Sequence, residues 1–274
     1  MSNSLPIKKI YVDSRYRTID SASDSDFKVQ LGRDIFLPDD CTMHIEHVVI
    51  PHTWYTIEQG INDGMYLKVT QGSTTTCTIL TIPSTNYTGA SLATAAQHAL
   101  SAVYPGSFVV IYDTLKNNLT IAITSNSSFK ILTDHELSTY LSNTWTGLNY
   151  DSSFPNSCND IVTNRTAKVN TFVSPFVSGG LNLQGFRNVY LSSSNLSSFN
   201  TLGAQGENTI VKKISTVSDF GFLIIGGAVS DHDYLDCSRM TLNTIDFQSR
   251  DVKGNFVPFH DNPVSFTIVF STKS

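Results

Sequence analysis

Carboxylate and imidazole side chains gather most densely in one short stretch of this sequence. Asp231-His-Asp-Tyr-Leu-Asp236 contains three carboxylates and one imidazole. The stretch lacks the glycine and the terminal acidic residue of an EF-hand calcium loop, and no second motif completes an acid–base site. We interpret it first as a solvated or capping loop; a divalent-cation site and interface salt bridges are the alternatives.

The spacing of histidines and cysteines gives little support to a metal centre. His44 and His47 are three positions apart on a predicted strand, so their side chains point to opposite faces unless a bulge intervenes. Zinc sites need closely spaced ligands. The sequence has four cysteines, which are Cys41, Cys77, Cys158 and Cys237, and no two of them form a Cys-x-x-Cys pair. We therefore predict no metal and four reduced, partly buried thiols.

Motifs of the common enzyme classes are missing as well. The sequence contains no Gly-x-Ser-x-Gly elbow, no His-Glu-x-x-His and no phosphate-binding loop ending in Gly-Lys-Ser/Thr. Trp54 and Tyr55 could stack against a sugar ring, but adjacent aromatic residues after a strand more often close the end of a β-sandwich. We predict no catalytic residues and no cofactor, and hence a protein that is not an enzyme.

Composition and charge exclude two further classes. The net charge is −5, and no basic stripe indicates a specific nucleic-acid binder. No apolar run reaches the ~18–20 residues of a membrane span, and the first residues lack the apolar core of a signal peptide. We expect synthesis in the cytoplasm. Charged residues make up 15% of the chain, below the roughly 25% of ordinary domains, which favours tight packing between neighbours over a freely solvated surface.

The strand patterns predict an all-β sandwich. Val264–Phe270 places apolar side chains at every second position, and Met240–Phe247 does the same with a change of phase near Asn243-Thr244 that indicates a β-bulge. We predict that these two strands form an antiparallel pair that closes the sandwich, with a reversal at Asp251–Asn255. Further short strands are predicted at 26–31, 41–50, 188–191, 209–215 and 222–225. On the strand at 41–50 we expect Val49 to share the buried face.

The region 61–170 has a different pattern of residues, and we predict that it is a small α+β insertion carrying one helix. Leu92, Ala96 and Leu100 recur at helical spacing within 91–103, and Thr88 or Ser91 can cap this helix. From Asn143 to Gln184 we predict a loop or linker. The predicted organisation is an amino-terminal arm at 1–25, a sandwich built from 26–60 and 171–274, and an insertion at 61–170.

An ordered set of motifs resembles the minor capsid (penton) proteins of virophages and Polinton-type mobile elements. These are Ile10-Tyr-Val-Asp-Ser-Arg-Tyr-Arg-Thr18, Asp24-Ser-Asp-Phe27, His47-Val-Val-Ile-Pro-His-Thr-Trp-Tyr-Thr-Ile57, Asn188-Val-Tyr-Leu-Ser-Ser-Ser-Asn-Leu196, Ser218-Asp-Phe-Gly-Phe222, Leu235-Asp-Cys237, Thr244-Ile-Asp-Phe247 and Asp251-Val-Lys-Gly254. Both ends of the chain carry the resemblance well, whereas the middle is similar more loosely.

The resemblance implies a single jelly roll in the virion, with five copies forming a capsomer at the icosahedral five-fold vertex beside a double-jelly-roll major capsid protein. Host receptors and internal virion proteins are further expected partners. We expect assembly contacts at Arg15, Tyr16 and Arg17 of the arm and at Trp54 and Tyr55. Two alternatives share the fold class: a jelly-roll module that attaches to glycans or receptors, and a cupin-like enzyme, which would need clustered His and Glu ligands.

Overall fold

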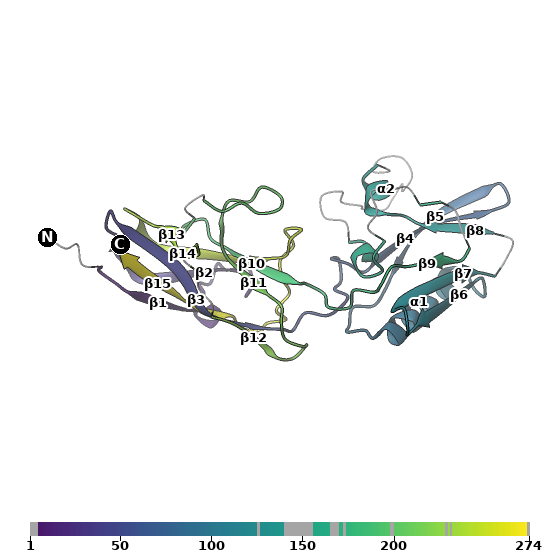
Figure 1. The fold of residues 1–274 in the computed structure, drawn as a ribbon, viewed down its shortest axis with the longest axis horizontal. Coiled ribbons are helices and arrows are strands. Elements are labelled where there is room, and N and C mark those ends of the chain that lie inside the picture. The colour runs from purple at the N-terminus through teal and green to yellow at the C-terminus, as the bar shows by residue number, and fades with distance from the viewer. Residues whose placement is uncertain are drawn as a thin grey trace. The chain divides into compact units, whose positions relative to one another are not determined.

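The chain folds into two compact units, and both of its ends belong to the first. The computed structural model describes residues 5–124, 127–139, 156–164, 170–171, 174–197, 200–227, 230 and 232–272. The first unit consists of Met1–Trp54 and Phe186–Ser274, and the second of Tyr55–Gly185 (Figure 1). The elements of the first unit are β1 (Lys9–Asp13), η1 (Ser14–Tyr16), β2 (Asp26–Phe36), β3 (Cys41–Pro51), β10 (Asn188–Ser192), β11 (Ile210–Ser215), β12 (Leu223–Gly226), β13 (Leu235–Asp236), β14 (Thr241–Arg250) and β15 (Ser265–Thr272).

The strand order of the first unit is that of a jelly roll. One sheet has the order β1-β15-β3-β12, with β13 also paired to β3, and the other has the order β11-β10-β14-β2. Apart from the short β13, the strands pair antiparallel from the outside of the sequence inwards: β1 with β15, β2 with β14, β3 with β12 and β10 with β11. A long hairpin wrapped into two sheets gives this order, so the predicted single jelly-roll sandwich is confirmed.

Aromatic side chains join the two sheets in the core. Phe247 of β14 lies 5.5 Å from Phe27 of β2 and 4.8 Å, edge to face, from Phe266 of β15, measured between ring centroids. β14 and β15 therefore face each other across the sandwich, and the prediction that they pair within one sheet is wrong. The alternation of apolar residues determines which side of a strand is buried, but it does not specify the neighbouring strand.

Two bulges change the buried face within long strands. The register between β14 and β2 shifts between Leu242 and Thr244, as predicted. A second shift, between β15 and β3, accompanies a positive φ of 50° at His47. Because His47 adds a residue on the outer face, Val48 and Ile50 are buried in place of the predicted Val49.

The segment 1–25, predicted to be an arm, contributes a strand to the core sheet. β1 pairs with β15, with Ile10 opposite Ile268 and Val12 opposite Phe266. Ile10 and Val12 are both buried, because alternating apolar residues next to an unpaired strand edge gain free energy by completing the sheet.

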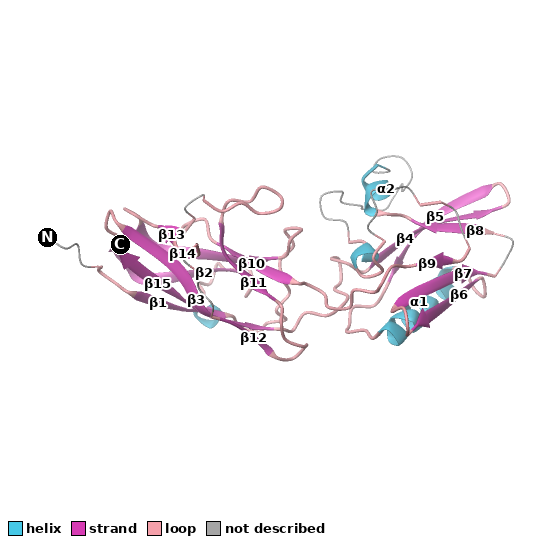
Figure 2. Cartoon of the chain, viewed as in Figure 1, coloured by secondary structure: helices cyan, strands magenta, loops and turns pink. Residues whose placement is uncertain are grey.

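The second unit is an α+β insertion between β3 and β10. Its strands form the three-stranded sheets β5-β4-β8 and β6-β7-β9, and α1 and α2 both lie in this unit (Figure 2). Its elements are β4 (Gly64–Gln71), β5 (Thr74–Thr81), α1 (Gly89–Val103), β6 (Phe108–Asp113), β7 (Asn118–Ile123), β8 (Ser128–Ile131), α2 (Asp134–Thr139), η2 (Cys158–Asp160) and β9 (Phe176–Val177).

The helix α1 forms for the reasons that its sequence indicates. Thr88 and Ser91 make a reciprocal capping box at its start, and Leu92, Ala96 and Leu100 are buried in a core that also includes Phe108 and Phe129. Within the described part of the chain, neither helix has the length and apolar content that a membrane crossing requires.

The insertion is longer than the predicted range 61–170. Ile57 makes a β-bridge with Thr85, and Leu181 is buried in the core of the insertion, so its flanks extend to Tyr55 and Gly185. Of the predicted loop at 143–184, residues 143–155, 165–169 and 172–173 lie outside the described residues. The described remainder contains η2 and the short strand β9, which the sequence did not indicate.

Candidate assembly surface

The predicted contact residues Arg15 and Tyr16 lie at the surface, in the short helix η1 after β1. Asp13 caps this helix by accepting a hydrogen bond from the backbone N of Arg15 at 3.0 Å. Arg15 Nη2 lies 2.6 Å from Asp13 Oδ2, and its hydrogen bonds hold the pKa of the Asp13 carboxyl below its usual value. The ring of Tyr16 is 80% exposed and is therefore available to a partner.

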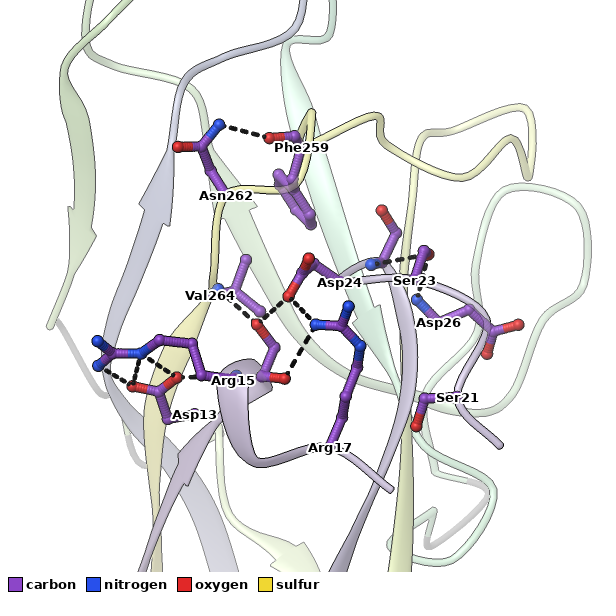
Figure 3. Close-up of polar contacts among 12 residues, drawn as sticks. Asp13, Arg15, Arg17, Ser21, Ser23, Asp24, Asp26, Phe259, Asn262 and Val264 are labelled. Atoms are coloured by element: carbon purple, nitrogen blue, oxygen red, sulfur yellow. Dashed lines mark hydrogen bonds and ion pairs between the residues drawn. The ribbon is translucent and has the colours of Figure 1, made fainter. Parts of the chain in front are cut away.

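Arg17, by contrast, makes hydrogen bonds within its own chain. Its Nη1 donates to Asp24 Oδ1 at 2.8 Å and to Ser14 O at 3.2 Å (Figure 3). The buried Asp24 also accepts from Ser14 Oγ at 2.5 Å, and Ser14 Oγ accepts from the backbone N of Val264 in turn. These bonds tie the end of β1 to the segments before β2 and β15. Arg17 is a structural residue in this fold.

Removing the carboxylate of Asp24 is expected to loosen this tie. Asp24→Ala removes the carboxylate that accepts from Ser14 Oγ and from the Arg17 guanidinium, which should cost about 1–3 kcal/mol of stability. Hydrogen exchange of the β1 amides should then accelerate about 10- to 100-fold. Asp20→Asn is the control, since Asp20 is exposed and its bonds to Thr18 and to Lys28 Nζ, the latter at 2.9 Å, lie at the surface. Equal exchange in both variants would contradict the role assigned to Asp24.

Trp54 is a core residue rather than a contact residue. Its side chain is 1% exposed and lies against His52, Phe186 and Phe259, with centroid distances of 4.4, 5.9 and 6.2 Å. The ring closes the end of the sandwich and offers no free face to a sugar or a partner subunit. Tyr55, half-buried, begins the second unit, and its backbone N donates to Glu58 Oε1 at 2.6 Å.

A group of exposed apolar residues lies on and before β12, and the sequence patterns did not single it out. β12 forms one edge of its sheet: within the described residues it pairs only with β3. Phe222, Leu223 and Ile225 are 66%, 56% and 69% exposed. We call the following exposed residues the edge patch: Val217, Phe220, Phe222, Leu223 and Ile225. Exposed apolar groups on a strand with an unpaired edge mark interaction sites.

A hollow lies at the opposite edge of the same sheet. A cavity of about 410 Å³ opens beside β1, the strand at the other end of the order β1-β15-β3-β12. Tyr11 and Tyr16, each 80% exposed, form part of its wall together with the apolar Val12, Val29 and Phe266. We call this cavity the amino-terminal hollow. The two edges of one sheet thus carry different apolar features, one exposed and one recessed.

The polar clusters do not form a metal site in the described part of the chain. The bulge at His47 leaves both His44 and His47 off the core face, yet no group of three or more His, Cys, Asp or Glu side chains among the described residues could hold an ion. In the acidic loop, Asp233 pairs with Lys212 Nζ at 3.0 Å; Asp231 lies outside the described residues.

Comparisons with known proteins show likeness to solved structures at the level of the fold. No family model and no curated protein matches this sequence. Among solved structures, the crystal structure of the mavirus penton protein is similar, with 10% sequence identity, a TM-score of 0.46, and coverage of 97% of this chain and 100% of the other. At this identity and TM-score, the likeness does not carry the function of that protein over to this chain.

Proposed function

We propose that this chain is a structural capsid protein of the virion, with five copies forming a ring-shaped capsomer at the icosahedral five-fold vertex beside a double-jelly-roll major capsid protein. It has no catalytic role in this proposal. The motifs that resemble minor capsid proteins support it, because those at 10–18, 24–27, 188–196, 244–247 and 251–254 lie in the jelly-roll unit and the one at 47–57 begins there.

The observation that carries the proposal is the pair of unlike apolar features at opposite edges of one sheet. A ring with five-fold symmetry requires a heterologous interface, in which one surface of each subunit meets a different surface of the next. The edge patch of one copy can fill the amino-terminal hollow of its neighbour, leaving that neighbour's edge patch for the following copy. An interface between two identical patches would stop at a dimer.

Charged substitutions in the edge patch should abolish the ring. Leu223→Asp combined with Ile225→Asp places two carboxylates in the apolar contact, at a cost of about 2–4 kcal/mol per interface. Native mass spectrometry should show a species with five times the mass of the 30.1 kDa chain for the unmodified protein, and monomers for the variant. Leu115→Asp is the matched control, since Leu115 is 95% exposed in the insertion, and it should leave the ring intact.

Mixing two defective variants tests the head-to-tail arrangement itself. Subunits carrying Tyr11→Asp and Tyr16→Asp in the hollow retain their edge patch, and the edge-patch variant retains its hollow. The mixture therefore has one intact interface and should form heterodimers that cannot grow into rings. A chain that stays monomeric at all concentrations, alone and with its major capsid protein, would refute the proposed function.

A further inference from the structure

Two cysteines that are 196 positions apart meet in the core of the jelly-roll unit. Cys41 is the first residue of β3 and Cys237 directly follows β13. Their Sγ atoms are 3.3 Å apart, and both residues are fully buried as thiols. Nothing in their sequence positions predicts this contact.

The backbone holds the two residues opposite each other. β13 pairs antiparallel with β3, with Leu235 opposite Met43 and Asp236 opposite Thr42, and the backbone N of Cys237 donates to Cys41 O at 3.1 Å. Opposed residues in antiparallel strands have Cα atoms about 4.5–5.5 Å apart, within the range of about 4.4–6.8 Å that a disulfide spans. Joining the sulfurs therefore requires side-chain rotation rather than movement of the strands.

We propose that Cys41 and Cys237 form a disulfide when the folded chain leaves a reducing compartment for an oxidising one. A small disulfide such as glutathione disulfide is the oxidant. One cysteine thiolate attacks it and releases one glutathione thiol, and the second cysteine then displaces the other. The two cysteines lose two protons and two electrons, and the oxidant gains both. Local opening of β13, which has only two residues, admits the reagent to the buried pair.

The other two cysteines are poor competitors for this reaction. Cys77 lies in β5 and Cys158 in η2, both in the insertion. Burial raises the pKa of the Cys77 thiol, and it raises that of Cys158 to about 12. The contact between the sulfurs of Cys41 and Cys237 favours this pair, because the second step of the exchange needs a thiol within reach of the first sulfur. The bond would fasten the segment after β13 to the start of β3 and close a loop that contains the whole insertion. This inference rests on the contact between the two sulfurs and not on the proposed function.

The test is to treat the purified full chain with glutathione disulfide and count its thiols after denaturation. The number of titratable thiols should fall from the four of the sequence to two. Peptide mapping without reductant should find Cys41 linked to Cys237, with Cys77 and Cys158 alkylated. The melting temperature should rise by roughly 5–10 °C on oxidation.

Control variants separate this pair from the others. Cys237→Ala should keep all of its remaining thiols and show no change of melting temperature on oxidation, whereas Cys77→Ala should respond as the unmodified chain does. Linkage of any other pair, or four free thiols under conditions that oxidise the unfolded chain, would overturn the proposal. The mapping uses the unmodified protein, so it stands even if Cys237→Ala does not fold. The oligomeric state is measured separately, so failure of the ring leaves this result intact.

Discussion

Replacing Phe247 with alanine is expected to lower the free energy of unfolding of the jelly-roll unit by about 3–5 kcal/mol. Phe247 is fully buried, and its ring contacts Phe27 in its own sheet and Phe266 in the facing one. Truncation removes this contact between the two sheets and leaves a cavity in the core. The cost is large because the strands around the site belong to two rigid sheets and cannot collapse to fill it.

Tryptophan fluorescence during urea denaturation measures the free energy of unfolding of the jelly-roll unit, in which Phe247 lies. The chain has two tryptophans, and Trp54 is buried in the jelly-roll core. A Trp145→Phe background removes the other, which lies outside the described residues. Phe36→Ala is the matched control, because Phe36 lies in β2 of the same sheet but is 68% exposed, and it should change stability by about 0.5 kcal/mol or less. Similar losses for both variants would show that Phe247 does not join the sheets.

Replacing Glu136 with glutamine is expected to destabilise the insertion by about 3–5 kcal/mol. Glu136 Oε1 lies 2.5 Å from Lys130 Nζ, and the two side chains are 0% and 6% exposed. Glu136 Oε2 also accepts from the backbone N of Thr133 and of Asn170 at 3.1 and 3.2 Å. The substitution removes the negative charge of Glu136 from beside the buried Lys130 ammonium. The new amide group also places N–H donors opposite the backbone N–H groups of Thr133 and Asn170, which need an acceptor.

A double variant tests whether the buried charge of Lys130 causes the loss of stability in Glu136→Gln. Lys130→Met together with Glu136→Gln removes both charges and should recover much of the stability that Glu136→Gln alone loses. Hydrogen exchange of the α1 amides reports the opening of the insertion by itself. Asp113→Asn, which breaks the exposed pair between Lys116 and Asp113 at 3.7 Å, should have little effect. If the double variant were no more stable than the single one, the buried charge would not be the cause.

Local sequence determined the elements of this protein well. The helical spacing of Leu92, Ala96 and Leu100 with a cap at Thr88 specified α1, and the change of phase at Asn243-Thr244 specified the bulge in β14. These features depend on residues within a few positions of one another, where backbone geometry links residue type directly to conformation. The number of short strands with alternating apolar residues predicted the sandwich class, because this alternation is also a local property of the backbone.

The tertiary structure alone decided which of these elements meet. Only the wrapped hairpin placed β14 and β15 in opposite sheets, buried Trp54 beneath Phe186 and Phe259, and brought Cys41 to Cys237. The exposure of Leu223 and Ile225 likewise depends on which face of β12 turns away from the core, because the tertiary structure buries Ile224 between them. A period of two specifies the face of a strand, whereas its neighbours depend on loops and packing partners more than a hundred residues away.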